Sequence, residues 1–234
     1  MTSKWIENLS SASDASNSLR RKQFHRIGTA TRRIVNAVVS SKAPSEELEQ
    51  IASQIEAAAD LIEVHPSGRD YEGFAEAANA GDASGFLDFS PISGLSNPIA
   101  PPIALSLELD EDGEQIVVGR VNYSLAYEGP PGSVHGGILA GAFDEVLGLA
   151  QSMSGSPGMT ARLTINYRKP TPWGQALRFE AKIVRRDGRK IYTEGRCYVG
   201  DVLTAQADAL FISVDMSKLI ELAVLREAQR EQRS

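Results

Sequence analysis

The sequence has very little cysteine and histidine: one cysteine, Cys197, and three histidines in 234 residues. A single cysteine excludes an intrachain disulfide and a cysteine-rich metal site, and it fits a reducing compartment. The histidines His25, His65 and His135 are too widely separated in the chain to have metal-ligand spacing. We therefore predict a cytoplasmic protein, with import into an organelle as the alternative, and we expect neither a metal nor another cofactor.

Long hydrophobic runs and common nucleotide signatures are also absent. No stretch approaches the 18 or more apolar residues of a membrane-spanning helix, and no secretory leader is apparent. The net charge of −6 argues against general nucleic-acid binding. A P-loop, a G-x-G-x-x-G and a G-x-S-x-G motif are all missing. We expect a globular protein without integral membrane association and without a nucleic-acid partner.

Composition and periodicity divide the chain into four parts. Residues 1–65 are predicted to form an N-terminal helical extension of two amphipathic helices, with about the first 18 residues disordered. Residues 66–102 are rich in Gly, Pro, Ser and Asn, which predicts a lid over a binding cleft or a plain linker. The third part, residues 103–215, carries the strand pattern, and residues 216–234 are predicted to be a charged C-terminal helix.

The third part alternates β-like segments with turn signals and contains one helix. That helix is predicted from about Gly136 to Met153. A long helix after the first strands, followed by a meander of four strands, indicates an α+β domain whose sheet wraps around the helix. The segments with the length and alternation of strands are 103–109, 116–127, 159–169, 176–186, 190–199 and 203–214.

The stretch GPPGSVHGGILAGAFDEVLG, residues 129–148, carries the chemistry of this domain. Gly136 and Gly137 at the helix start let a ligand oxygen approach the free backbone N–H groups, where the helix dipole favours negative charge. Asp144 stands two turns further on among apolar residues, so we expect it to be buried. It is then a nucleophile, a general base or a structural carboxylate, and Glu145 is the second candidate.

The spacing of these groups places a constraint on the site. Gly136 and Asp144 are eight residues apart, which is about 12 Å along a helix. Reacting atoms must approach within about 3 to 3.5 Å, so one helix cannot present both groups to one substrate. The simplest solution is a symmetric dimer in which Gly136 of one protomer faces Asp144 of the other. Gly137, Gly141 and Gly148 share the face of Asp144 and allow close packing there.

The combined motifs resemble hotdog-fold acyl-CoA thioesterases. The motifs are HGG-x6-D, then T-x5-N-Y-x-x-P and a DGRK turn, and the resemblance covers residues 100–214. The nearest type is that of the phenylacetate pathway and the human mitochondrial thioesterase superfamily. This implies hydrolysis of acyl-CoA to a carboxylic acid and coenzyme A within fatty acid metabolism. It also implies a homo-oligomer, dimer or tetramer, with shared active sites, and coenzyme A that is part of the substrate.

The resemblance also implies roles for individual residues. The N–H of Gly136, with Gly137 adjoining, polarises the thioester carbonyl. Asp144 acts as nucleophile or as base for water, and Thr160 orients it. His135 either contacts the substrate or fixes the turn through a structural hydrogen bond. Coenzyme A is held by residues that match the family pattern, with the last two facing the nucleotide phosphates: Asn166, Arg178, Arg189 and Lys190.

Two other functions fit parts of the pattern. A non-catalytic acyl-CoA-binding module or sensor would share the fold and the ligand, but Asp144 would be dispensable in it. A hydratase or dehydratase of the same fold would pair a catalytic histidine with the acid in a different local motif, which this sequence lacks. Thiol release from acyl-CoA distinguishes the first of these alternatives from a thioesterase.

Overall fold

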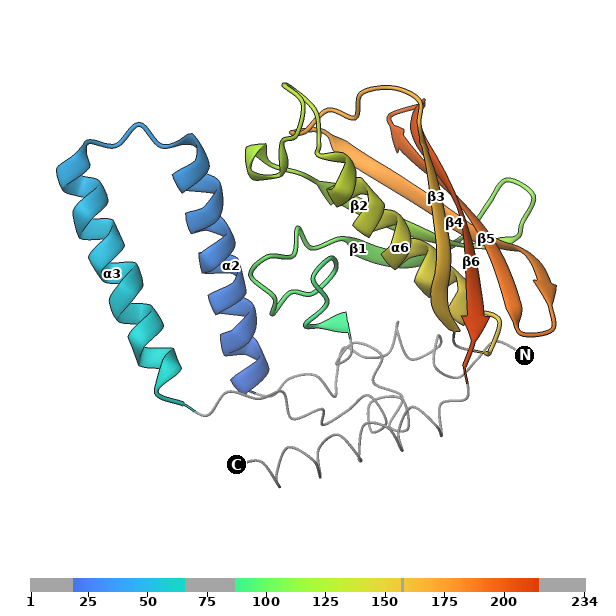
Figure 1. The fold of residues 1–234 in the computed structure, drawn as a ribbon, viewed down its shortest axis with the longest axis horizontal. Helices are drawn as coiled ribbons and strands as arrows, with labels where there is room; N and C mark the ends of the chain where they lie inside the picture. Colours follow the sequence, from blue (N-terminus) through green and yellow to red (C-terminus); the bar gives the residue numbers. More distant parts are fainter. Residues whose placement is uncertain (1–18, 66–86, 157, 215–234) are drawn as a thin grey trace.

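A computed structural model describes residues 19–65, 87–156 and 158–214 of the chain. A six-stranded sheet curves around one long helix, and two N-terminal helices stand beside it (Figure 1). Three predictions lie wholly or partly outside the described residues: the disordered start, the C-terminal helix at 216–234, and the first part of the 66–102 loop. Within the described ranges, no helix combines the length and the apolar character needed to cross a membrane.

The strand prediction is confirmed at all six places. The strands pair antiparallel throughout, in the order β1-β2-β4-β5-β6-β3. The second predicted segment ends early, because Ser124 caps a short 3-10 turn, η1 (Leu125–Tyr127). The strands are β1 (Ala104–Leu109), β2 (Gln115–Asn122), β3 (Gly158–Tyr167), β4 (Ala176–Asp187), β5 (Lys190–Val199) and β6 (Val202–Ser213).

The predicted four-strand meander is wrong in one respect, because only β4, β5 and β6 follow one another in the sheet. β3 lies at the far edge and pairs with β6. The connection from β3 to β4 does not form a hairpin, and its two prolines, Pro170 and Pro172, cannot donate to a ladder. Instead the Val134 N–H donates to the Thr171 carbonyl at 2.8 Å, so this connection pairs with the segment that leads into the central helix.

The core lies between the inner face of the sheet and the central helix, α6 (Gly136–Ser152), which was predicted to within a residue. Phe143 of α6 packs edge-to-face on Phe179 of β4, with ring centroids 5.1 Å apart. Gly195 of β5 lies under the helix, where a Cβ atom would stand 3.2 Å from Leu147. The glycine therefore allows the close approach of α6 to the middle of the sheet.

The two predicted N-terminal helices are present as α2 (Leu19–Ser40) and α3 (Ser45–Glu63). α2 packs on the body: a Cβ atom at Gly28 would stand 2.5 Å from the Leu95 carbonyl oxygen. No residue of α3 is buried, and α3 stands further from the sheet than α2 does (Figure 1). The hairpin therefore covers the body with its first helix only.

Candidate active site

The start of α6 is built around His135, which is the N-cap residue of the helix. Its Nδ1 accepts a hydrogen bond from the Gly137 N–H at 3.0 Å, so this ring nitrogen carries no proton. The Gly136 N–H has no acceptor among the residues that the structure describes. Of the two amides that the sequence singled out, one is therefore occupied by His135 and the other is open to a ligand.

Tyr167, at the end of β3, holds this helix start in place. Its hydroxyl donates to the Gly136 carbonyl oxygen at 2.8 Å. On the other side, the His135 N–H donates to the Tyr127 carbonyl oxygen at 2.9 Å. The anchoring bond of Tyr167 depends on the crossover of β3, which no local pattern in the sequence signals.

Asp144 and Thr160 are brought together across α6 and β3. The Thr160 hydroxyl donates to Oδ1 of Asp144 at 2.8 Å, although the two residues are 16 positions apart. Both are exposed in the single chain, so the expectation that Asp144 is buried is wrong. The reason is the topology: β3 is an edge strand, and the small-residue face of α6 lies beside this open edge.

A β-bulge in β3 aims Thr160 at the helix. Thr160 pairs with Phe211 and Arg162 pairs with Leu210, so Ala161 is an extra residue without a partner in β6. Side chains alternate between faces along a strand, and a bulge shifts that alternation by one. Thr160 can therefore face α6 together with Leu163, which packs against the core.

Glu145, the neighbouring carboxylate, has a different environment. Its Oε1 accepts hydrogen bonds from the hydroxyls of Ser90, at 2.6 Å, and Ser93. Between these serines, Ile92 approaches Gly141 so closely that a Cβ atom there would stand 2.7 Å from Ile92 Cδ1. Part of the small-residue face of α6 is thus occupied by the chain's own 87–102 segment, and Glu145 holds that segment.

The 87–102 segment is also fastened to α2. Asp88 is 6% exposed and accepts hydrogen bonds from the Ser96 hydroxyl at 2.6 Å and from Arg21 Nε at 3.2 Å. His25 Nε2 lies 2.6 Å from the other carboxylate oxygen of Asp88. The described part of the predicted lid or linker therefore bridges α2 and α6.

The predicted coenzyme A residues fall into two groups. Asn166 and Arg178 lie on the outer face of the sheet, because their neighbours in each strand face α6. Arg189 and Lys190 lie at the β4–β5 turn. Lys190 of β5 pairs with Ile212 of β6, and Ile212 pairs on its other side with Met159 of β3. Within one chain, Arg189 and Lys190 therefore lie at the Thr160 end of the sheet. Asn166 and Arg178 lie on the face of the sheet that points away from α6.

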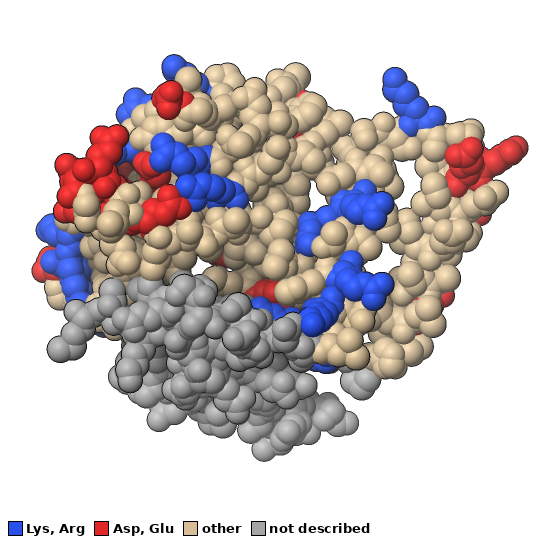
Figure 2. Space-filling model, turned by 180° about the vertical axis from the view of Figure 1, so that it is seen from behind, with Lys and Arg blue, Asp and Glu red and all other residues tan. Residues whose placement is uncertain are grey.

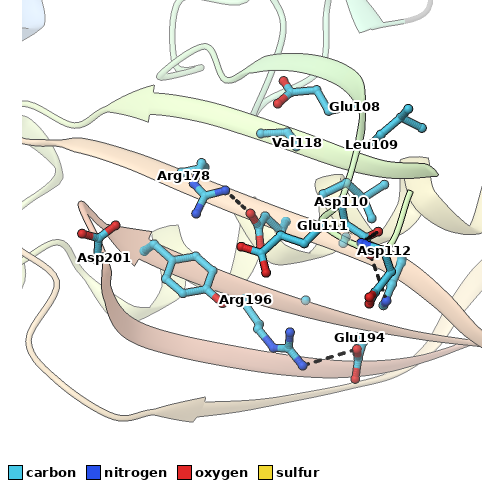
Figure 3. A pocket seen from close by; sticks show the side chains of 16 residues that line it. Glu108, Leu109, Asp110, Glu111, Asp112, Val118, Arg178, Glu194, Arg196 and Asp201 are labelled. Atoms are coloured by element: carbon cyan, nitrogen blue, oxygen red, sulfur yellow. Dashed lines mark hydrogen bonds and ion pairs between the residues drawn. The ribbon is translucent and has the colours of Figure 1, made fainter. Parts of the chain in front are cut away.

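Arg178 belongs to a groove on that outer face (Figure 3). It forms an ion pair with Glu180, and its guanidinium lies 5.0 Å from the centroid of the Tyr198 ring. Seven carboxylates and three cations line the groove, and acidic and basic side chains also gather on the sheet side of the molecule in Figure 2. This excess of carboxylates disfavours a polyanion such as the coenzyme A nucleotide, and the role of Arg178 stays a prediction.

Other catalytic chemistry has little support in the described part of the chain. It contains no cluster of three or more His, Cys, Asp or Glu side chains suited to a metal ion. Burial raises the pKa of the Cys197 thiol to about 12, so this cysteine stays protonated and is a poor nucleophile.

Comparison with known proteins agrees with this geometry. The family model of the thioesterase superfamily matches residues 131–207, which include α6, β3, β4, β5 and the first half of β6. Acyl-coenzyme A thioesterase THEM4 of Xenopus laevis is 36% identical over 89 residues, and that of Rattus norvegicus is 34% identical over 107 residues. These alignments cover 37% and 45% of this chain, and 40% and 46% of the relatives. The chain thus spans less than half the length of these curated relatives.

The similarity to one solved structure extends further along the chain. The crystal structure of a thioesterase superfamily protein is 32% identical and superposes with a TM-score of 0.68. The alignment covers 81% of this chain and 94% of that protein. The antiparallel sheet around a central helix is therefore the α+β hotdog fold that the sequence motifs predicted, and this chain belongs to the thioesterase superfamily.

Proposed function

We propose that this protein hydrolyses acyl-CoA thioesters to a carboxylic acid and free coenzyme A. The observation that carries the proposal is the hydrogen bond from Thr160 to Asp144 Oδ1, which orients an exposed carboxylate beside the open edge of the sheet. The unoccupied Gly136 N–H at the start of the same helix supplies an oxyanion donor. The names of the THEM4 relatives indicate the same substrate class.

The reaction needs two contributions from these residues. The Gly136 N–H binds the carbonyl oxygen as it becomes an oxyanion, a contribution worth about 3 kcal/mol per donor. Thr160 engages Oδ1 of Asp144, so Oδ2 is left for the reaction. Oδ2 either takes a proton from the attacking water or attacks the acyl carbon itself to form a mixed anhydride, which water then hydrolyses. In both routes the C–S bond breaks and coenzyme A leaves as the thiolate.

We further propose that the active site is shared between two protomers. β3 is an edge strand, and an edge presents unpaired N–H and C=O groups to another strand. Asp144 and Gly136 stand about 12 Å apart along α6, too far to act on one carbonyl from the same helix. Pairing of two β3 strands around a twofold axis brings each helix beside the partner's edge and lets the two groups come from different chains.

The substrate is proposed to reach the site with its nucleotide at the β4–β5 turn. Arg189 and Lys190 lie there at the Thr160 end of the sheet, and cations of these two types suit phosphate groups. This assignment and the acyl-CoA substrate follow from the family resemblance. The proposed cytoplasmic location follows instead from the single cysteine, which fits a reducing compartment. Reversing both charges should raise KM for acyl-CoA and leave KM for an acyl-pantetheine thioester, which lacks the nucleotide, unchanged.

The first experiment measures free-thiol release from acyl-CoAs of short, long and aromatic acyl groups. Asp144→Asn should lose 10²- to 10⁴-fold in kcat, because it removes the base or nucleophile while keeping the shape of the side chain. Thr160→Val should lower kcat about 10- to 100-fold, because it removes a hydrogen bond to a charged group. Asp208→Asn, on the exposed outer side of β6, is the matched control and should behave as wild type.

The same measurement separates the alternatives. Normal turnover by folded Asp144→Asn would overturn the catalytic assignment. Acyl-CoA binding without thiol release by the wild type would instead favour the acyl-CoA-binding module. Single turnover in ¹⁸O-labelled water identifies a mixed anhydride that water attacks at the aspartyl carbonyl carbon, because only that route places ¹⁸O in Asp144.

A mixing experiment tests the shared site. Gly136 is the first helical residue and His135 has an extended backbone, so Gly136→Pro can fit the helix start while removing the N–H. Gly136→Ala adds a Cβ atom, 3.3 Å from the Tyr167 hydroxyl, and keeps the N–H, which makes it the matched control. Heterodimers of Gly136→Pro and Asp144→Ala chains should recover part of the activity that neither homodimer has. No recovery in verified heterodimers would refute sharing.

A further inference from the structure

The N-terminal hairpin carries an apolar surface that the described residues leave exposed. Of the twenty large hydrophobic side chains that are exposed in the described residues, twelve lie between residues 19 and 65. Ile51 and Ile55 of α3 are 41% and 39% exposed, and none of the residues of α3 is buried. Most of the stability of a helix in a protein comes from tertiary packing of its apolar face. The hairpin therefore needs a partner surface.

The apolar residues form one stripe on each helix at about 100° per residue. On α3 the stripe contains Leu48, Ile51, Ile55 and Ile62. On α2 it contains Ile27, Ile34 and Val38, and it turns away from the side of α2 that holds Gly28 and packs on the body.

The two helices carry opposite charge. α2 has six Lys and Arg and no acidic residue, whereas α3 has six Asp and Glu and no basic residue. On the helical wheel, Lys22, Arg26 and Arg33 lie together on one side of α2, about 100–140° from the centre of its stripe. Glu47, Glu56 and Glu63 lie along the two edges of the α3 stripe. Figure 2 shows basic side chains along α2 and acidic ones on α3.

The charged side chains beside the two stripes form no ion pair with the described residues of the same chain. Among the ion pairs of the described residues, none joins α2 to α3. The polar contacts of α2 that reach the body come from its other side: His25 contacts Asp88, and Arg32 donates to the carbonyls of Leu95 and Asn97. Space-filling spheres leave open gaps between α2 and α3 (Figure 2).

We infer that the hairpin is an interface between copies of this chain, in which α2 of one copy packs against α3 of the other. One chain carries both complementary surfaces, so a twofold axis satisfies both contacts at once. The apolar stripes then form the core of an antiparallel four-helix bundle, and the flanking cations and carboxylates face each other at its edges. This contact is separate from the β3 edge and does not depend on the proposed reaction.

Charge reversal tests the inference on the full chain. One variant carries Lys22→Glu, Arg26→Glu and Arg33→Glu, and the other carries Glu47→Lys, Glu56→Lys and Glu63→Lys. Either variant alone places like charges across the interface. A 1:1 mixture places opposite charges across it again, while each hairpin keeps like charges within its own chain. Rescue by mixing therefore reports contacts between chains only.

The measurement is the mass of the assembly across a dilution series, by sedimentation and native mass spectrometry. The protein concentration at which half of the assembly has dissociated should be at least about tenfold higher for each variant than for the wild type. The mixture should regain the wild-type assembly and contain both variants in equal number. Glu111→Lys, Asp112→Lys and Asp201→Lys on the outer groove give the same net charge change as the α3 variant and should leave the assembly unchanged.

Two results would overturn the inference. Variants that assemble as the wild type does would show that the hairpin surfaces do not meet. Dissociated variants that the mixture fails to rescue would show that the charges pair within one chain or with another occupant. If one of the two variants misfolds, a chain that carries all six reversals provides the test. It restores opposite charges across the interface and should assemble as the wild type does. If this folded chain dissociates, the inference is overturned.

Discussion

α6 and α3 are both helices with apolar residues at helical spacing, but only one of them has its apolar residues covered. Phe143 and Leu147 of α6 are 1% and 0% exposed under the curved sheet, whereas no residue of α3 is buried. The difference is not one of helix-forming ability, since both were predicted from periodicity. It depends on what lies opposite: a six-stranded sheet of the same chain for α6, and no described segment of the same chain for α3.

The carboxylates of the two helices differ in the same way. Glu145 of α6 is bound by two serine hydroxyls, and Asp144 is bound by Thr160. The acidic residues of α3 form no ion pair among the described residues. A carboxylate whose partners come from distant parts of the chain has a defined position, so it can act on a substrate or hold a loop. A row of exposed carboxylates instead suits a charged partner surface.

The largest expected effect comes from equal truncations in the two helices. Phe143→Ala removes a buried ring that packs on Phe179 and should lower the free energy of unfolding by about 3–5 kcal/mol. Ile51→Ala should change it by no more than about 0.5 kcal/mol at low protein concentration, because Ile51 is exposed in the single chain. Urea denaturation followed by circular dichroism measures both values.

Protein concentration sharpens this first prediction. Ile51→Ala should become destabilising relative to wild type as the concentration rises, because only the assembled state covers Ile51. Phe143→Ala should cost the same amount throughout. A large loss for Ile51→Ala at the lowest concentration would mean that the single chain covers α3 itself, which would contradict the comparison.

A second, smaller effect separates the carboxylates. Glu145→Gln weakens two hydrogen bonds from Ser90 and Ser93 to a charged acceptor and should cost about 1–3 kcal/mol. The matched change Glu56→Gln on exposed α3 should stay within about 0.5 kcal/mol. Hydrogen exchange gives an independent measurement, since faster exchange should be confined to the 87–102 segment in the Glu145 variant. Equal costs for the two variants would argue against a loop-holding role of Glu145.

The smallest effect concerns the outer face of the sheet. Hydrogen bonds from Arg120 and Ser106 lower the pKa of Glu108 from 4.5 to about 2. A lowered folded-state pKa stabilises the protein above pH 4.5, and this contribution is lost as the pH falls towards 2. Because the pair is exposed, the loss should not exceed about 1 kcal/mol. Arg120→Met should flatten this part of the stability curve; an unchanged acid slope would show that the pair contributes nothing.

The sequence was sufficient to predict the secondary-structure elements and to nominate the candidate site residues. Periodicity and turn signals located all six strands, α6 and both N-terminal helices, because alternation and 3.6-residue spacing are local properties. The HGG-x6-D spacing identified Gly136 and Asp144, and the strand motif identified Thr160. The same reasoning failed for β3, which was expected inside a meander and lies at the sheet edge.

The misplaced strand also explains why the burial of Asp144 was predicted wrongly, because the edge position of β3 leaves Asp144 exposed. The crossover of β3 brings Tyr167 onto Gly136. This contact has no signal in the neighbouring residues, because it joins positions 31 residues apart in the chain.

By itself, the sequence determined which segments become helices and strands, which residues are candidates for the chemistry, and that α2 and α3 have opposite charge. Only the tertiary structure decided which of these residues meet. The bulge at Ala161 turns Thr160 towards Asp144, and His135 occupies the Gly137 amide and leaves the Gly136 amide open. The physical reason is that a propensity is summed over neighbours in the chain, whereas a hydrogen bond or a buried contact depends on the path of the whole chain in space.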